Sequence, residues 1–206
     1  MYTLHHCKGC GSTVVQAALR LAGAPFRVEE VEPWTPGPAV EALRAKNPLV
    51  QVPTLILPSG EVMTESVAIL AHLIEMFPDA GLAPPPGSDE RARMWRWLVF
   101  LATNVYGAIG VGDHPEHWIA DDQKEALQAG ALDVIKRSWE ILEQNVRGPY
   151  LAGDRFTILD VYAAMMSYWR PRRPWIDEHC PRVAAAMRRA EAHPVIAELW
   201  PANFPL

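Results

Sequence analysis

The sequence predicts a chain in two parts, an α/β part followed by an all-helical part. Residues 1–81 alternate short strand signals with helix signals, which is typical of a partly parallel sheet covered by helices. Residues 82–89 include Pro84-Pro85-Pro86-Gly87, which disfavours both a helix and a central strand, so this segment is interpreted as a linker. Over residues 90–206, apolar residues recur at helical spacing, which predicts an all-helical domain.

The elements of the first part follow from β-compatible runs, turn residues and helix caps. Ser12 and Ser66 are favourable N-caps ahead of apolar helical segments, and Pro38 stands in the first turn of a short helix. Pro58-Ser59-Gly60 is a turn that lets residues 61–63 pair back as a hairpin. Strands are therefore expected over residues 2–6, 26–31, 52–57 and 61–63, and helices over residues 13–21, 38–45 and 66–77.

The helices of the second part follow from apolar stripes opposite polar faces. Thr157-Ile158-Leu159-Asp160 resembles a capping box, with Asp where Glu or Gln is usual, and it predicts the start of a helix. The stripes run over residues 94–109, 132–146, 161–169 and 183–192.

Composition and charge exclude several classes of function. The 206 residues carry 19 Lys and Arg against 24 Asp and Glu, a net charge of −5 with no basic block, which argues against nucleic-acid binding. The longest uncharged run, residues 98–112, is shorter than the roughly 20 residues of a membrane span. The first residues lack the basic start and apolar core of a signal peptide. A cytoplasmic protein without membrane or nucleic-acid partners is expected.

The three cysteines are expected to be free thiols rather than a disulfide framework. A metal site is not expected either. His5 and His6 are adjacent on a strand and point to opposite faces, so they do not converge on one ion with Cys7 and Cys10. The second cysteine pair of a structural zinc site is absent from the sequence.

Residues 7–12 carry the first candidate chemistry. A thiol or hydroxyl at a helix N-terminus lies near unpaired N–H groups and the positive end of the helix dipole, which stabilise a thiolate. Cys10 and Ser12 are both placed to use this environment, and Cys7-Lys8-Gly9-Cys10 has the Cys-x-x-Cys spacing of a redox pair. A simple helix cap at Ser12 with incidental cysteines is the alternative.

Two further segments have the chemistry of a peptide-binding site. If the Val52-Pro53 bond is cis, the backbone N–H and C=O of Val52 turn outward and can pair with a peptide-like ligand. Ser66 opens a helix whose N–H groups can bind a carboxylate, and Glu65 beside it can hold an ammonium group. The alternatives are an ordinary trans proline and a capped helix with a favourable acid in its first turn.

In combination and in this order, these segments resemble the glutathione transferase superfamily, in particular its bacterial members. The resemblance covers nearly the whole chain, and its most specific parts are the Val-Pro and Glu-Ser segments. The matching segments are Cys10-Gly11-Ser12, Ala18–Gly23, Asn47–Leu55, Thr64–Ile69, Leu151–Asp160 and Pro181-Arg182-Val183.

The resemblance implies a thioredoxin-like N-terminal domain over residues 1–81, a helical C-terminal domain and a homodimer. It implies glutathione as co-substrate, bound by Gln51, Val52, Pro53, Glu65 and Ser66. The Val52-Pro53 peptide would be cis, the Val52 backbone would pair with the cysteinyl part, and Glu65 and Ser66 would hold the γ-glutamyl group. The sequence departs from the best-known pattern because it has no evident catalytic Tyr. Ser12 and Cys10 are therefore both candidate catalytic residues.

The activity implied is conjugation of the glutathione thiolate to a small hydrophobic electrophile, a detoxification reaction, with Asn104 and Tyr106 as candidate electrophile-site residues. Packing in the core is the alternative for Tyr106. Two other functions stay open. One is a glutathione-dependent thiol-disulfide reductase that uses Cys10, and the other is a non-catalytic ligand-binding protein on the same fold.

Overall fold

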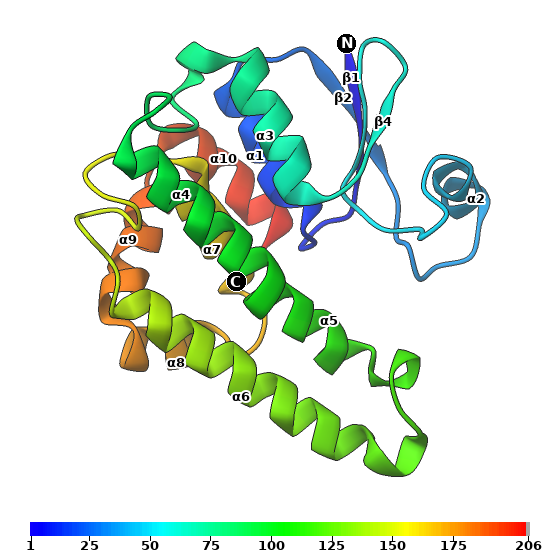
Figure 1. Ribbon diagram of the computed structural model, residues 1–206. Helices are drawn as coiled ribbons and strands as arrows, with labels where there is room; N and C mark the ends of the chain where they lie inside the picture. Colours follow the sequence, from blue (N-terminus) through cyan, green and yellow to red (C-terminus); the bar gives the residue numbers. More distant parts are fainter. Residues whose placement is uncertain (205–206) are drawn as a thin grey trace. The chain divides into compact units, whose positions relative to one another are not determined.

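The computed structural model describes residues 1–204, which form two compact units (Figure 1). The first unit comprises residues 1–83 and the segment from residue 191 onward, and the second comprises residues 84–190. The predicted fold class is confirmed, with a small mixed sheet and its helices followed by a helical part. The division differs from the predicted boundaries at one point, because the segment from residue 191 packs with the N-terminal unit.

The sheet of the first unit has four strands in the order β2-β1-β3-β4. β1 (Tyr2–His6) lies parallel to β2 (Phe26–Glu30), as expected for strands joined by a helical crossover. β3 (Thr54–Ile56) runs antiparallel to β1, and β4 (Val62–Met63) runs antiparallel to β3 through a short hairpin. Every residue of the central strand β1 is buried, so its C-terminal end fixes where the following loop begins.

Three helices cover the sheet. α1 (Ser12–Leu21) and α3 (Ser66–Met76) pack together on one side, and α2 (Pro38–Arg44) lies on the other (Figure 1). The helices on the first side bury their apolar stripes, which include Val14, Val15, Ala18, Leu70, Leu73 and Ile74. α2 contributes Val40 and Leu43 to a small cluster with Val31.

Two helix caps differ from the sequence prediction. Gly11 rather than Ser12 stands at the N-cap of α1, and Glu65 rather than Ser66 stands at the N-cap of α3. Both serines are instead the first residue of their helix, one position further along the chain. The hydroxyl of Ser12 does not cap α1, because it turns back toward Cys7 and His6.

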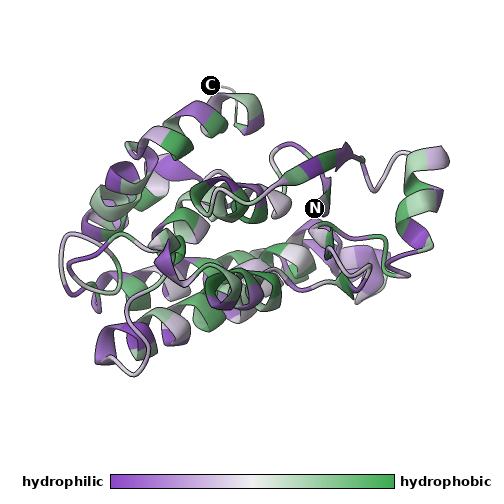
Figure 2. Cartoon of the chain, turned by 90° about the horizontal axis from the view of Figure 1, so that it is seen from above, coloured by the Kyte–Doolittle hydropathy of each residue, from purple (hydrophilic) through white to green (hydrophobic). Residues whose placement is uncertain are grey.

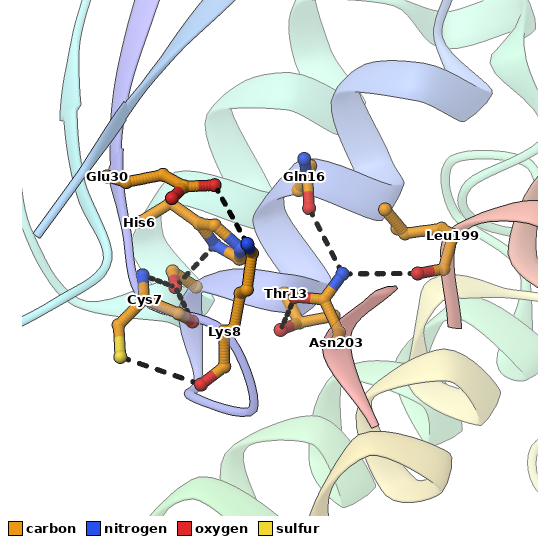
Figure 3. Close-up of polar contacts among 9 residues, drawn as sticks. His6, Cys7, Lys8, Thr13, Gln16, Glu30, Leu199 and Asn203 are labelled. Carbon is orange, nitrogen blue, oxygen red and sulfur yellow. Dashed lines mark hydrogen bonds and ion pairs between the residues drawn. The ribbon is translucent and has the colours of Figure 1, made fainter. Parts of the chain in front are cut away.

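The last helix, α10 (Pro194–Asn203), belongs to the N-terminal unit and packs on α1. Thr13 Oγ1 donates to Asn203 Oδ1 at 3.1 Å, and the Arg20 guanidinium meets Glu198 Oε1 at 3.1 Å. Figure 3 shows the side chain of Asn203 reaching from α10 to Thr13 of α1. These long-range polar contacts explain why the end of the chain leaves the helical domain that the sequence predicts over residues 90–206.

The second unit contains helices only. They are α4 (Asp89–Phe100), the π-helix η2 (Leu101–Tyr106), α5 (Gly107–Asp113), the 3₁₀ helices η3 (Pro115–His117) and η4 (Asp121–Gln123), α6 (Lys124–Glu143), α7 (Ile158–Met166), α8 (Arg173–His179) and α9 (Pro181–Glu191), whose last residue falls to the first unit. The long helices alternate in hydropathy along their length, the pattern of helices buried on one face (Figure 2). Within residues 1–204, no helix is long and apolar enough to cross a membrane.

The predicted capping box at the start of α7 is confirmed, and it is buried. Asp160 Oδ2 accepts hydrogen bonds from the backbone N–H of Thr157 at 2.9 Å and from its hydroxyl at 3.0 Å. Asp160 Oδ1 accepts from the N–H of Leu151 at 2.8 Å, which ties the preceding loop to the helix. Burial raises the pKa of Asp160 to about 6, although all three hydrogen bonds act in the opposite direction.

We expect this raised pKa to make stability depend on pH. Between about pH 4 and pH 6, native Asp160 holds a proton that the unfolded chain has released, so its contribution to the free energy of unfolding declines as pH rises. Urea titrations at both ends of this window should show a larger loss for wild type than for Asp160→Asn, which does not titrate there. Equal losses would mean that the hydrogen bonds outweigh burial.

Candidate functional site

The loop between β1 and α1 is a tight turn that carries two thiols. The N–H of Cys10 donates to the C=O of Cys7 at 3.2 Å, and the N–H of Thr13 donates to the C=O of Cys10 at 3.0 Å. Gly9 has φ +71°, a conformation that favours glycine. A Cβ at this position would also lie 3.4 Å from the backbone oxygen of Asn203 in α10. The turn and the last helix are therefore fitted closely together.

The hydroxyl of Ser12 ties the end of this loop back to the residues at its start, His6 and Cys7. It lies 2.8 Å from His6 Nδ1, accepts from the N–H of Cys7 at 3.1 Å and donates to the C=O of Cys7 at 3.2 Å. Ser12 and His6 are both buried, and Figure 3 shows His6 and Cys7 with dashed lines for their hydrogen bonds. The position of Ser12 suits a structural role. Its predicted catalytic role stays a prediction, and it requires the hydroxyl to leave these partners.

The three cysteines of the chain are free, and two of them meet in this turn. Cys7 is buried, and Cys10 is the more exposed of the pair. Burial raises the pKa of both thiols, and for Cys10 a hydrogen bond with the Cys7 thiol raises it further. Both groups are therefore protonated at neutral pH. This differs from the lowered thiol pKa that the N-terminus of α1 alone would favour.

Val52 lies just before β3 and presents free backbone groups. The Val52-Pro53 peptide is cis, as the family resemblance implies. Within residues 1–204, neither the N–H nor the C=O of Val52 has a hydrogen-bond partner. Its side chain packs against the cluster formed by Val31, Val40 and Leu43. The side chain is thus held by the unit while the backbone is available to an extended ligand.

Asn47 is a buried residue that holds the loop before β3 and that the site prediction did not name. Its buried amide donates to the C=O of Gln51 and to Thr54 Oγ1, each at 3.1 Å, and its Oδ1 accepts from the N–H of Leu49 at 3.1 Å. Thr54 Oγ1 donates in turn to the C=O of Gln51 at 2.8 Å. These bonds fix the loop that carries Gln51 and Val52. The Asn-Pro motif was visible in the sequence, but no local signal assigned its amide to this loop.

Glu65 and Ser66 stand at the N-terminus of α3. Glu65 is exposed and has φ +62°, an uncommon backbone conformation for a residue with a side chain. Such strained residues cluster at ligand sites. Met63, the last residue of β4, pairs with Leu55 of β3, so the start of β3 and the end of β4 lie at the same end of the hairpin. Val52, Pro53, Glu65 and Ser66 therefore gather at one end of the hairpin.

Asn104 and Tyr106, the predicted electrophile-site residues, lie in the second unit on the π-helix η2. Asn104 is exposed, and its amide donates to the C=O of Phe100 at 3.1 Å and to Thr103 Oγ1 at 3.0 Å. The ring of Tyr106 packs at 4.9 Å from that of Trp169. Short π-helical segments are frequent at functional sites, and this one sets both residues on a single helical stretch.

Known proteins resemble this chain in sequence and in fold. Residues 4–85 match a family described as "Glutathione S-transferase, N-terminal domain". The uncharacterized GST-like protein YncG of Escherichia coli (strain K12) is 35% identical over 187 residues, which cover 90% of each chain. The bacterial beta class glutathione S-transferase of Sphingomonas chungbukensis has a TM-score of 0.82 at 27% identity, covering 99% of this chain and 100% of that one. A sphingomonad glutathione S-transferase complexed with glutathione has a TM-score of 0.78 at the same identity and coverage.

We expect Asn47→Ala to lower the free energy of unfolding by about 1–3 kcal/mol, because it removes one buried and two partly buried hydrogen bonds from the loop between α2 and β3. Urea unfolding measures the loss. Asn145→Ala is the matched control, because that amide donates to the C=O of Ile141 at the surface. Its loss should stay within about 0.5 kcal/mol. Equal losses for the two variants would contradict the role given to Asn47.

Proposed function

The chain belongs to the glutathione S-transferase superfamily, and we propose that it conjugates the thiolate of glutathione to a small hydrophobic electrophile. One observation carries this proposal: the unpartnered backbone of Val52 and the N-terminus of α3 lie at the same end of the β3–β4 hairpin. Glutathione is a peptide with an amino-acid head group, and these two features offer a strand partner for its cysteinyl backbone and an anion site for its γ-glutamyl head group.

Each group of glutathione has a suitable partner in the first unit. The N–H and C=O of Val52 suit the cysteinyl backbone, in the manner of a strand added to an edge. The carboxylate of Glu65 suits the γ-glutamyl ammonium, and Ser66 with the N–H groups of α3 suits the γ-glutamyl carboxylate. Gln51 is exposed directly before Val52, and Pro53 directs the chain from this loop into β3.

Cys10 is the more accessible candidate for activating the sulfur. Its thiol stays protonated at neutral pH, because burial raises its pKa, so its S–H can donate to a glutathione thiolate. Donation to the charged form lowers the pKa of the bound glutathione thiol, and the start of α1 adds a favourable dipole. The thiolate then attacks the electrophile while the protein supplies proximity. Ser12 is the second candidate, and it would act in the same way if its hydroxyl were released.

The electrophile is proposed to contact Asn104 and Tyr106, because the π-helix offers an exposed amide and an aromatic ring on one stretch. We also propose that the protein forms a homodimer and acts in detoxification. A thiol-disulfide reductase that uses Cys10 is the second candidate function, since Cys7 stands beside it. The raised pKa disfavours that function, because the thiolate rather than the thiol attacks disulfides.

We expect Glu65→Gln to weaken glutathione binding about 10- to 100-fold, because it removes the charge that would pair with the ammonium group. Calorimetric titration of the reduced protein with glutathione measures this loss. Glu61→Gln is the matched control, because Glu61 is an exposed acid in the same hairpin. Equal affinity in wild type and Glu65→Gln would remove Glu65 from the site, and no binding to wild type would overturn the proposed function.

Conjugation of glutathione to an activated aryl halide separates the two candidate catalytic residues. Cys10→Ala should lower kcat about tenfold or more, because it removes the S–H donor, whereas Cys10→Ser should keep much of the rate. Ser12→Ala should lose stability, because it removes the buried Oγ partner of His6 Nδ1 and of the Cys7 N–H, while the folded protein keeps its kcat. The opposite pattern, with kcat lost only in Ser12→Ala, would assign activation to Ser12.

A further inference from the structure

The Cys7–Cys10 turn has the geometry of a dithiol that can close into a disulfide. A four-residue turn with a hydrogen bond between its ends keeps the end Cα atoms within about 7 Å of each other. A disulfide joins cysteines whose Cα atoms are about 4.4–6.8 Å apart. The Cys10 N–H to Cys7 C=O bond at 3.2 Å defines such a turn, and the two thiols stand at its two ends. Both cysteines are free in the structure.

We propose that Cys7 and Cys10 are a redox-active pair that glutathione disulfide oxidises to an intramolecular disulfide, and that this oxidation switches off the site at the start of α1. The second half of the proposal rests on the proposed function, because it takes Cys10 as the donor to the glutathione sulfur. The first half rests on the turn alone.

The reaction proceeds through two exchanges that balance in atoms and electrons. Cys10 is the more exposed thiol, so it loses its proton and attacks one sulfur of glutathione disulfide. The disulfide bond of the oxidant breaks, and one glutathione leaves as a thiolate that takes up a proton. Cys7 then loses its proton and attacks Cys10 Sγ, which releases the second glutathione. The protein loses two electrons and two protons, and two molecules of reduced glutathione are formed.

The surroundings of the turn allow this closure without a change elsewhere. The only hydrogen bond that the Cys7 thiol donates within residues 1–204 goes to the C=O of Lys8 at 3.5 Å, a weak contact (Figure 3). Ser12 holds the N–H and C=O of Cys7, so the Cys7 backbone stays in place while its side chain turns. Lys8 between the cysteines has an exposed side chain, so it can follow the remaining adjustment.

Closure has a direct effect on the proposed site. The disulfide has no S–H, so Cys10 can no longer donate to a glutathione thiolate. We expect the oxidised protein to lose about as much conjugating activity as Cys10→Ala does, and to regain it when a dithiol reductant reopens the turn.

The test incubates the full-length reduced protein with glutathione disulfide, stops the reaction with acid and reads the intact mass. Wild type should lose two hydrogens, whereas Cys7→Ala should stop with one glutathione attached to Cys10. Cys10→Ala should show at least a tenfold slower reaction, because Cys7 is buried. Cys180→Ala is the matched control and should behave as wild type, because Cys180 is fully buried in the second unit. Circular dichroism checks that each variant is folded.

The dependence on pH adds a second readout. Burial holds the pKa of both thiols above their ordinary value, so the reactive thiolate is a minor species. The rate of oxidation should therefore rise about tenfold for each pH unit between pH 7 and pH 9. Wild type that stays reduced at pH 9, or that ends as a stable adduct with glutathione, would overturn the proposal.

The same assay distinguishes failure of this proposal from failure of the proposed function. Bis(2-hydroxyethyl) disulfide lacks the glutathione head group, so it should oxidise wild type and Glu65→Gln at equal rates. If the turn closes with this reagent but reduced glutathione does not bind, the redox pair is supported and the proposed glutathione site is contradicted. If glutathione binds and is conjugated while no reagent closes the turn, the redox pair is contradicted and the proposed function is supported.

Discussion

The buried hydroxyl of Ser12 is the interaction on which the turn between β1 and α1 depends. It contacts His6, the last residue of the central strand, and both backbone groups of Cys7. One side chain of α1 therefore connects the strand, the turn and the helix by hydrogen bonds. A buried polar group of this kind must be satisfied or it costs stability, which makes the turn rigid. The thiols of Cys7 and Cys10 therefore meet at a position set by the core, and α10 closes against the same turn near Gly9.

A second buried polar group does the same for the other half of the site. The amide of Asn47 holds the loop before β3. The Val52 side chain packs against the cluster of Val31, Val40 and Leu43. Neither backbone group of Val52 has a hydrogen-bond partner within residues 1–204, so this residue can extend main-chain hydrogen bonding to a ligand. The antiparallel pairing of β3 with β4 then brings the start of β3 and the segment that leads to the strained Glu65 to the same end of the hairpin. Two loops far apart in the sequence thus offer complementary groups to one peptide-sized ligand.

The sequence was sufficient for most elements and for the segments of the site, but not for how they are fixed. Periodicity and turn residues predicted the strands and helices of the first unit, and the capping box at Asp160 was visible in four residues. The sequence placed the N-caps of α1 and α3 at Ser12 and Ser66, one residue too late in each case. Serine is favoured at N-caps, but tertiary contacts decide which residue takes that position. The contact of Asn203 with Thr13 joins residues 190 positions apart, and no local pattern encodes it.

Burial has opposite consequences for the two chemistries open to Cys10. A raised pKa keeps the thiol protonated, which suits a hydrogen-bond donor and handicaps a nucleophile. A reductase must pass through the thiolate in every cycle, so the penalty recurs at each turnover. A switch passes through it once for each change of state and tolerates a slow step. The same burial therefore favours conjugation as the recurring reaction at this turn, with closure of the disulfide as an occasional event that stops it.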